Sequence, residues 1–326
     1  MDKKVKTFAY NRNIPKNRPK IVVILGPTAS GKSDLAVEIA LQLSSGQAKK
    51  SEIKGAEIIS ADSRQVYKGL DLGSGKITKK EMEGIPHHML DVANPKKTFT
   101  VSQYQKLGQK AIKIILKKNK IPIICGGTGL YIDSLIYNRQ FPEVPPQPKL
   151  RKKLEKLTTE KLFEKLKKLD SRRAKNIDEH NRRRLIRALE IVIITGKPVP
   201  RIAGSIDKTA QFDTLIIGIR KSQTELKKAI TKRLYKRLKQ GMIAEIKNLR
   251  RRGLSWKKLD DFGLEYRFIS RYLRGLLNKK EMEKLIIKES QRYAKRQMTW
   301  FKRDRQIRWI TDKKESFHLI KNFLNK

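Results

Sequence analysis

The chain has 326 residues, enough for one large domain or for a core domain with a smaller second unit. Its 77 lysines and arginines outnumber its 32 acidic residues. The formal net charge of +45 indicates either a polyanionic partner, nucleic acid first of all, or the basic surface of a lysine-rich lineage. The single cysteine, Cys125, excludes an internal disulfide and a cysteine-based zinc site, and it fits a reducing, cytoplasmic compartment.

The N-terminal part of the chain contains a polar tail and then a strand, a glycine-rich loop and a helix. Residues 1–20 lack the apolar stretch of a secretory signal, so we expect a basic, disordered tail there. No run anywhere in the chain reaches the length of a membrane span. Residues 21–25 form a continuous apolar run typical of a buried parallel strand, and a helical pattern extends from Ser33 to about Leu43.

The loop between this strand and this helix has the phosphate-binding pattern known as a P-loop, in which two glycines with four residues between them precede a lysine and a serine. Backbone N–H groups of such a loop converge on phosphate oxygens, the lysine adds positive charge, and the serine hydroxyl is a ligand for Mg²⁺. We therefore expect a diphosphate-bearing substrate here, with Mg²⁺ on the serine. The residues of the loop are Gly26, Pro27, Thr28, Ala29, Ser30, Gly31, Lys32 and Ser33.

Strands and helices continue to alternate after the P-loop. A strand over residues 56–60 leads to Asp62, a helix is expected over 102–118, and a strand over 121–125 leads to Gly126-Gly127-Thr128 and a helix over 130–137. This alternation predicts a parallel α/β sheet, whose ligands bind at the carboxyl edge. A carboxylate there, Asp62, is a candidate magnesium ligand or general base, or it only caps the next helix. The Gly-Gly-Thr loop taken alone is a weak signal.

Two further groups of residues are expected to be structural. The adjacent His87 and His88 point in different directions on most backbones and have no cysteine or third histidine nearby, which favours a structural role over a metal site. Trp256, Trp300 and Trp309 are predicted to lie in the core rather than to stack on bases.

The middle of the chain changes character. Four prolines between 142 and 148 mark a linker, and residues 149–187 have a helical pattern with 16 lysines and arginines in 39 residues, against 77 in 326 overall. A strand over 212–219, helices from Ser222, a strand over 307–310 and a last helix follow. We expect a P-loop NTPase-like α/β core over 21–141 and 206–326, with a helical insertion over 142–205.

Seven motifs occur in an order that closely resembles the tRNA dimethylallyltransferase family, over nearly the whole chain from about Lys20 to Ile310. Each of the later motifs is modestly specific, and the ordered set is very specific. The motifs are GPTASGKS (26–33), IISADSRQVYKGLDLG (58–73), PHHMLD (86–91), GGTGLY (126–131), RRLIRALE (183–190), GLEYR (263–267) and RQMTWF (296–301).

The resemblance implies prenyl transfer on a P-loop fold. Dimethylallyl diphosphate would place its diphosphate on the loop, with Mg²⁺. The acceptor would be N6 of the adenosine next to the anticodon on its 3′ side, in tRNAs that read codons starting with U. The family's helical insertion grips the anticodon stem-loop, and the target base is drawn out of its stack. Nothing in the sequence requires more than a monomer.

The resemblance also assigns roles to individual residues. Asp62 matches the general base that takes a proton from the exocyclic amine, and Thr128 matches the residue that hydrogen-bonds near this amine and the diphosphate. Arg233, eight residues before Gly241, resembles an arginine on the diphosphate side. Positions that match tRNA contacts are Asp62, Ser63, Arg64, Gln65, Thr128, Arg151, Arg183, Arg184, Leu185, Ile186 and Arg187.

The chain departs from the family in one loop, and other functions stay open. Many members have Asp-Ile-Gly-Thr-Ala-Lys-Pro where this chain has DLGSGKI at 71–77, which lacks the proline. A C-terminal zinc finger of eukaryotic relatives is absent, so the bacterial type is the better match. The alternatives are an isopentenyltransferase acting on AMP, ADP or ATP, a small-molecule kinase with a P-loop, and a non-enzymatic RNA-binding protein. The first two leave the basic insertion unexplained, and the third leaves the P-loop without a purpose.

Overall fold

The computed structural model describes residues 18–45, 53–137, 139, 141–200 and 211–325. The chain divides into two units, one formed by residues 1–138 and 209–326 and the other by residues 139–208. We call these the core and the insertion. Most of the predicted tail, residues 1–17, lies outside the described residues, and Lys20 already belongs to the first strand.

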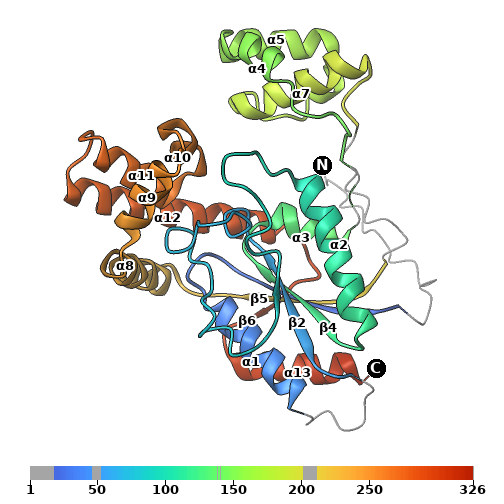
Figure 1. The fold of residues 1–326 in the computed structure, drawn as a ribbon. Coiled ribbons are helices and arrows are strands. Elements are labelled where there is room, and N and C mark those ends of the chain that lie inside the picture. The colour runs from blue at the N-terminus through green and yellow to red at the C-terminus, as the bar shows by residue number, and fades with distance from the viewer. Residues whose placement is uncertain (1–17, 46–52, 138, 140, 201–210, 326) are drawn as a thin grey trace, which may run out of the picture. The chain divides into compact units, whose positions relative to one another are not determined.

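The core is built on one six-stranded sheet in which each strand runs parallel to its neighbours. The strand order is β3-β2-β4-β1-β5-β6, so the strand that precedes the P-loop lies in the interior of the sheet (Figure 1). The strands are β1 (Lys20–Leu25), β2 (Ala56–Ala61), β3 (His87–His88), β4 (Ile121–Gly126), β5 (Asp213–Ile219) and β6 (Arg308–Ile310).

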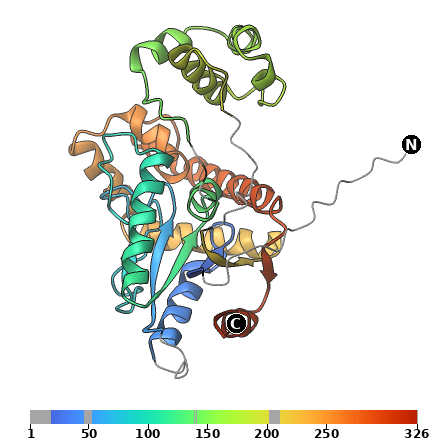
Figure 2. The same ribbon diagram turned by 90° about the vertical axis from the view of Figure 1, so that its right-hand side faces the viewer.

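Helices cover both faces of this sheet because successive side chains of each strand point to opposite sides. Ile21, Val23 and Leu25 of β1 pack in one cluster together with residues of α2, α3 and α8–α12. Val22 and Ile24 pack in a second cluster together with α1 and α13 (Figures 1 and 2). The helices are α1 (Lys32–Ser44), α2 (Val101–Lys117), α3 (Gly129–Ile136), α8 (Gln223–Lys239), α9 (Met242–Arg251), α10 (Trp256–Phe262), α11 (Leu264–Leu273), α12 (Lys279–Phe301) and α13 (Lys313–Leu324).

Several helices begin at capping residues that the sequence supplies. Thr100 and Gln103 form a reciprocal capping box at the start of α2, Ser222 and Glu225 form another at α8, and Asn278 begins α12 in the same way. Each box satisfies two backbone N–H groups that lack partners within the helix. The strongly basic C-terminal half of the core is therefore helical from α8 to α12, as its spacing predicts.

The insertion is an all-helical unit with a hydrophobic cluster of its own. Its core contains Leu162 and Leu166 of α5, which pack with Leu185 and Leu189 of α7. Thr158 and Asn181 cap α5 and α7 with their side chains, and α7 ends at Gly196 in a left-handed conformation. The helices are α4 (Pro148–Glu155), α5 (Thr159–Leu169), α6 (Ser171–Ala174) and α7 (Arg182–Thr195).

The histidine pair forms a short strand that the sequence did not predict. His88 pairs with Ile59 in the parallel register of β3 with β2, and its Nε2 lies 2.7 Å from Oε2 of the buried Glu57. Lys118 and Lys120 also contact Glu57, each with Nζ at 3.0 Å from Oε1. Burial alone would raise the pKa of Glu57, but these three hydrogen-bonding partners lower it to about 2. His88 thus has a structural partner in the carboxylate.

Trp256, Trp300 and Trp309 are partly buried against the larger core cluster, in agreement with their predicted packing role.

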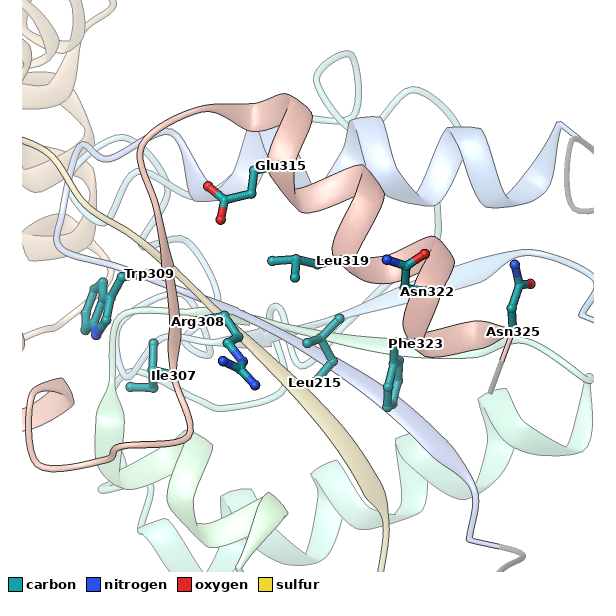
Figure 3. A pocket seen from close by; sticks show the side chains of 9 residues that line it. All are labelled: Leu215, Ile307, Arg308, Trp309, Glu315, Leu319, Asn322, Phe323 and Asn325. Carbon is teal, nitrogen blue, oxygen red and sulfur yellow. The ribbon is translucent and has the colours of Figure 1, made fainter.

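A pocket of about 850 Å³ lies between β6 and α13 and includes Leu215 from the first half of β5 (Figure 3). None of the predicted site residues lines this pocket. In the part of the chain that the structure describes, no helix is long and apolar enough to cross a membrane.

Candidate active site

Three loops that follow neighbouring strands meet at the carboxyl edge of the sheet. The P-loop follows β1, Asp62 follows β2, and Gly127-Thr128 follow β4. The order β2-β4-β1 places these strand ends side by side, since the carboxyl ends of parallel strands share one edge. The structure therefore brings together the P-loop, Asp62 and Thr128.

The P-loop has the backbone conformation of an anion site. Gly31, with φ 87°, precedes the first residue of α1, and Ala29 is also in the left-handed region at φ 63°. Such a turn lets N–H groups of the loop point into one concave space at the helix N-terminus. Lys32 lies against this loop and donates from Nζ to the carbonyl of Pro27 at 3.3 Å. Burial lowers the pKa of Lys32, and Arg233 and Arg237 lower it further.

Asp62 is held in place by the backbone that follows it. Its Oδ1 accepts hydrogen bonds from the N–H of Arg64 at 2.7 Å and of Gln65 at 3.3 Å. No helix begins directly after Asp62, so Asp62 is not a helix cap, and these bonds fix its carboxylate in a turn at the end of β2. A positioned carboxylate at the ligand edge of the sheet can accept a proton from a bound nucleophile.

Thr128 joins the ends of β2 and β4. Its Oγ1 accepts from the N–H of Ser63 at 3.1 Å, and its own N–H donates to the carbonyl of Ala61 at 3.0 Å. Tyr293 of α12 is a neighbour, and burial followed by the charge of Asp62 raises the pKa of its phenol to about 12. Tyr293 therefore keeps its proton at neutral pH. Together these contacts fix Thr128 relative to Asp62.

A pair of stacked tyrosines lies beneath this edge. The rings of Tyr104 and Tyr131 are 3.8 Å apart and nearly parallel, and the hydroxyl of Tyr104 donates to the carbonyl of Ser60 at 2.9 Å. Burial raises the pKa of both phenols. The packing of α2 and α3 thus supports the strand end from which Asp62 projects.

Arg233 lies at the P-loop, as its motif predicts. Its Nη2 donates to Oγ1 of Thr28 at 2.6 Å. Burial, followed by the charge of Arg237, lowers the pKa of Arg233 to about 10, so the guanidinium is still charged at neutral pH. The long segment between β5 and the C-terminus therefore supplies a second cation beside Lys32.

Gln297 is a site residue that motif matching did not single out. Its Oε1 accepts from the N–H of Thr28 at 2.8 Å, and its Nε2 donates to the carbonyl of Gly127 at 2.8 Å. One buried side-chain amide thus joins the P-loop to the Gly-Gly-Thr loop. Its presence in the RQMTWF motif was the only signal in the sequence.

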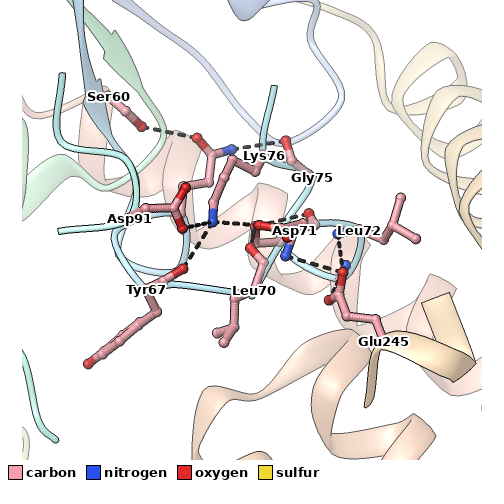
Figure 4. Close-up of polar contacts among 12 residues, drawn as sticks. Ser60, Tyr67, Leu70, Asp71, Leu72, Gly75, Lys76, Asp91 and Glu245 are labelled. Atoms are coloured by element: carbon pink, nitrogen blue, oxygen red, sulfur yellow. Dashed lines mark hydrogen bonds and ion pairs between the residues drawn. The ribbon is translucent and has the colours of Figure 1, made fainter. Parts of the chain in front are cut away.

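The loop at residues 71–76, where the sequence departs from the resembled family, is held by two side chains (Figure 4). Glu245 of α9 accepts from three consecutive N–H groups, those of residues 71, 72 and 73, and from the hydroxyl of Tyr266 at 2.9 Å. Lys76 donates from Nζ to Asp71 and Asp91, each at 2.6 Å. The loop has a defined course without the proline, because side-chain partners replace the rigidity that proline would provide.

The predicted tRNA-contacting residues near Asp62 contact the protein itself. Gln65 accepts from Oγ of Ser60 at 3.0 Å and donates to the carbonyl of Gly75 at 3.0 Å. Arg64 donates from Nε to the carbonyl of Phe262 at 2.6 Å. These bonds order the turn that contains Asp62. A direct contact of Ser63, Arg64 and Gln65 with tRNA stays a prediction.

The predicted residues of the insertion divide into buried and exposed groups. Arg151 forms a two-pronged pair with the fully buried Glu190, with Nε and Nη2 at 2.8 and 2.7 Å from its oxygens, and Arg187 reaches the same carboxylate at 2.5 Å. Burial would raise the pKa of Glu190, but Arg151, the N–H of Gln147 and Arg187 lower it to about 2. Arg151 and Arg187 are therefore structural ion-pair partners in this structure.

The remaining predicted residues lie on α7. Leu185 and Ile186 are buried in the core of the insertion, so their side chains pack and do not present a surface to RNA. The sequence motif contains them because the apolar face of α7 alternates with its charged face. Arg183 and Arg184 are exposed on that charged face.

The side chains around the P-loop fit a divalent metal ion that is held mainly by a phosphate-bearing ligand. No group of three or more His, Cys, Asp or Glu side chains suited to a metal occurs among the described residues. Ser33, the second residue of α1, offers one hydroxyl beside the loop. Mg²⁺ commonly keeps several waters and binds through one or two protein groups and substrate phosphates. The donor set at the P-loop is of that kind.

Comparison with known proteins agrees with this geometry. Residues 65–304 match the model of the IPP transferase family. The chain is 39% identical over 292 residues to the tRNA dimethylallyltransferase of Anoxybacillus flavithermus, covering 89% of this chain and 90% of the relative. It is 40% identical over 315 residues to that of Thermoanaerobacter sp., covering 94% and 96%.

Solved structures show the same likeness. The tRNA isopentenylpyrophosphate transferase of Bacillus halodurans superposes with a TM-score of 0.68 at 32% identity, covering 94% of this chain and 97% of that one. A eukaryotic dimethylallyltransferase acting on tRNA superposes with a TM-score of 0.71 at 26% identity, covering 86% and 69%. With a family model that covers most of its length and relatives that match nearly all of it, the chain belongs to the IPP transferase family, the family of the tRNA dimethylallyltransferases.

Proposed function

We propose that this enzyme transfers the dimethylallyl group of dimethylallyl diphosphate to N6 of the adenosine on the 3′ side of the anticodon, in tRNAs that read codons starting with U. The observation that supports this most is the convergence of a P-loop with Asp62 and Thr128 at one edge of the sheet. A P-loop binds the leaving group, and a fixed carboxylate serves the incoming amine.

The diphosphate binds to the P-loop amides, Lys32 and Arg233, and Ser33 would hold Mg²⁺. Charge develops on the diphosphate as the C1–O bond breaks, and these donors stabilise it. Bound Mg²⁺ supplies further neutralisation of the phosphate oxygens. The N6 lone pair forms the new bond to C1, while the electrons of the C1–O bond leave with diphosphate.

Asp62 accepts the proton that N6 loses. An exocyclic adenine amine is a weak nucleophile, so a base that removes this proton as the bond forms lowers the barrier. Thr128, fixed by the N–H of Ser63, hydrogen-bonds near the amine and the diphosphate. Asp62 follows β2 and the P-loop follows β1, with β4 between them at the same carboxyl edge of the sheet. The base and the leaving group can therefore act on one acceptor and donor pair bound at this edge.

The insertion favours tRNA over a free nucleotide. Its exposed faces contain many of the 16 basic residues between 149 and 187, and a free nucleotide would need no such surface. We propose that this unit binds the anticodon stem-loop through Arg183, Arg184 and neighbouring cations of α4 and α5. We propose that Arg151 and Arg187 stabilise the fold of the insertion through their ion pairs with Glu190.

One assay tests the function. The protein is incubated with Mg²⁺, labelled dimethylallyl diphosphate and either tRNA or AMP, ADP and ATP, and the label is followed into each acceptor. We expect label in tRNA, at the adenosine beside the anticodon. Label in a free nucleotide would show the adenylate-modifying reaction instead, and transfer of phosphate from ATP would show a kinase.

A further inference from the structure

A second arginine of α8 faces the P-loop site one helical turn after Arg233. Arg233 and Arg237 are four residues apart, so both side chains project from the same face of the helix. The first donates to Thr28 of the P-loop at 2.6 Å. The charge of Arg237 acts on Lys32 and on Arg233, because it contributes to the lowered pKa of both groups.

Gly75 makes room for the guanidinium of Arg237. A Cβ placed on Gly75 would lie 2.5 Å from Cζ of Arg237 and would overlap Nη2. Gly75 has φ +66°, a conformation that glycine adopts without strain. Its carbonyl accepts from Nε2 of Gln65, whose N–H donates to Asp62. The arginine therefore lies against a loop that is connected by two hydrogen bonds to the carboxylate.

The ion pair of Arg237 leaves part of its hydrogen-bonding capacity unused. Its side chain is 12% exposed, and its ion-pair partner among the described residues is Glu265 of α11, with Nη1 and Oε1 3.7 Å apart. This separation is too long for a hydrogen bond. Glu265 thus balances the charge and orients the guanidinium, while an arginine has five N–H groups to donate.

Three cations gathered in a partly buried place repel one another. Arg237 acts on both Lys32 and Arg233, and Arg233 acts on Lys32, while the carboxylates of Asp62 and Glu265 only partly offset this repulsion. Burial is the main cause of the lowered pKa values of Lys32 and Arg233, the neighbouring cations lower them further, and a ligand with several negative charges relieves the repulsion. A diphosphate is such a ligand.

We propose that Arg237 is a further diphosphate-binding residue of this enzyme and that Gly75 admits its guanidinium to the site. The inference rests on the proposed prenyl-diphosphate function and adds to it a second arginine, placed beside the loop at residues 71–76. Arg233 contacts the P-loop hydroxyl of Thr28, and Arg237 reaches the side of the diphosphate that faces Gly75.

The test measures binding of inorganic pyrophosphate with Mg²⁺ by titration calorimetry, and transfer to tRNA in parallel. Arg237→Met removes the charge and keeps the length of the side chain, and Arg237→Lys keeps the charge without the planar fork. We expect Arg237→Met to weaken pyrophosphate binding and raise the KM for dimethylallyl diphosphate about tenfold or more, as for loss of a charge-assisted hydrogen bond. The KM for tRNA should stay unchanged, and Arg237→Lys should recover part of the loss.

Gly75→Ala tests the second half of the proposal against a matched control. Gly84 also has a positive φ, +80°, and a Cβ there meets no atom within 4 Å, so Gly84→Ala introduces similar backbone strain without contact to Arg237. We expect Gly75→Ala, and not Gly84→Ala, to weaken pyrophosphate binding. Because both changes act through one guanidinium, adding Gly75→Ala to Arg237→Met should cost little more than Arg237→Met alone.

Several outcomes would overturn the inference. Unchanged pyrophosphate affinity in Arg237→Met would exclude the contact, and reduced thermal stability with normal affinity would assign Arg237 to the structure of the loop. If the losses of pyrophosphate affinity from Gly75→Ala and Arg237→Met multiply in the double variant, then Gly75 does not act through Arg237. Failure of the wild-type enzyme to modify tRNA while still binding pyrophosphate would refute the proposed acceptor and leave the role of Arg237 intact.

Discussion

Gln297 accepts a hydrogen bond from the N–H of Thr28 at 2.8 Å, across 269 residues of sequence. The same amide donates to the carbonyl of Gly127 at 2.8 Å, so a single side chain from α12 sets the separation of the loops after β1 and β4. In the proposed function, the diphosphate binds to the first of these loops and the attacking amine lies near Thr128 of the second. Their relative position thus depends on a residue near the end of the chain.

Replacing Gln297 by methionine is expected to lower both stability and activity. The substitution removes a donor and an acceptor and leaves two backbone groups without partners, at a cost of about 1–3 kcal/mol for each buried group. Chemical denaturation measures the stability, and steady-state transfer to tRNA measures the activity. Gln240→Met, on the exposed end of α8, is the control and should change neither. Normal kcat in Gln297→Met would show that the two loops keep their spacing without the amide.

Asp62→Asn should abolish transfer and spare binding. Asparagine retains the shape and an oxygen that accepts from Arg64 and Gln65, but it cannot take the proton from N6, and general-base catalysis is typically worth about 10²–10⁴-fold in rate. Single-turnover transfer gives the rate, and pyrophosphate and tRNA binding are measured separately. Equal losses of binding and of turnover would contradict the role of base.

Glu190→Gln should destabilise the insertion selectively. Arg151 and Arg187 would both lose a carboxylate, and because their side chains are each 35% exposed, the cost should lie below the about 3–5 kcal/mol of a fully buried ion pair. Hydrogen exchange of the α7 amides reports the loss, with the amides of α1 as the internal control. If both sets of amides exchange alike, the two units do not unfold separately.

The same carboxylate predicts a response to acid. Its pKa is lowered from 4.5 to about 2 in the folded unit, so Glu190 contributes stability that is fully present above about pH 4.5 and is lost as the pH falls toward 2. The protection of the α7 amides, measured relative to their intrinsic exchange rates, should fall in the wild type as the pH falls through this window. Glu190→Gln should show little further change there, because the titrating group is gone.

Removing the charges of Arg183 and Arg184 should weaken tRNA binding and flatten its salt dependence. Each lost phosphate contact reduces the slope of log K against log salt by about 1. Filter binding at several salt concentrations measures the slope. Neutralising Lys314 and Lys321 on α13 changes the net charge equally and is the control. Identical slopes in the two double variants would indicate a general charge effect instead of contacts at α7.

The strands of the core could be predicted because each is a short apolar run with a clear end. Five of the six strands agree with the predicted ranges within one residue at each end. The exception is β3, which has two residues and is defined by its pairing with β2 and by the bond of His88 to Glu57. Two residues have no periodicity, so neither polarity nor spacing could indicate this strand.

The site was predictable where a side chain follows a strand and much less so where it projects from a helix. Asp62 and Thr128 lie at the strand ends, where the pattern of strands placed them. Gln297 and Arg237 lie in long helices with many polar and basic residues, and the sequence does not distinguish which of these side chains face the site. In the insertion, the motif 183–190 includes Leu185 and Ile186, which are buried. A motif records that residues occur together, and only packing separates those that form a core from those that face a partner.

The position of β5 has a consequence for the order in which the protein forms during synthesis. This strand pairs with β1 yet comes after the whole insertion, and Gln297 follows much later. The emerging chain therefore completes the insertion, with its own hydrophobic cluster, while the P-loop strand still has an unpaired edge. A nascent chain that stops before α12 would have its P-loop and its Gly-Gly-Thr loop but no Gln297 amide to join them, so incomplete products should not consume the prenyl donor.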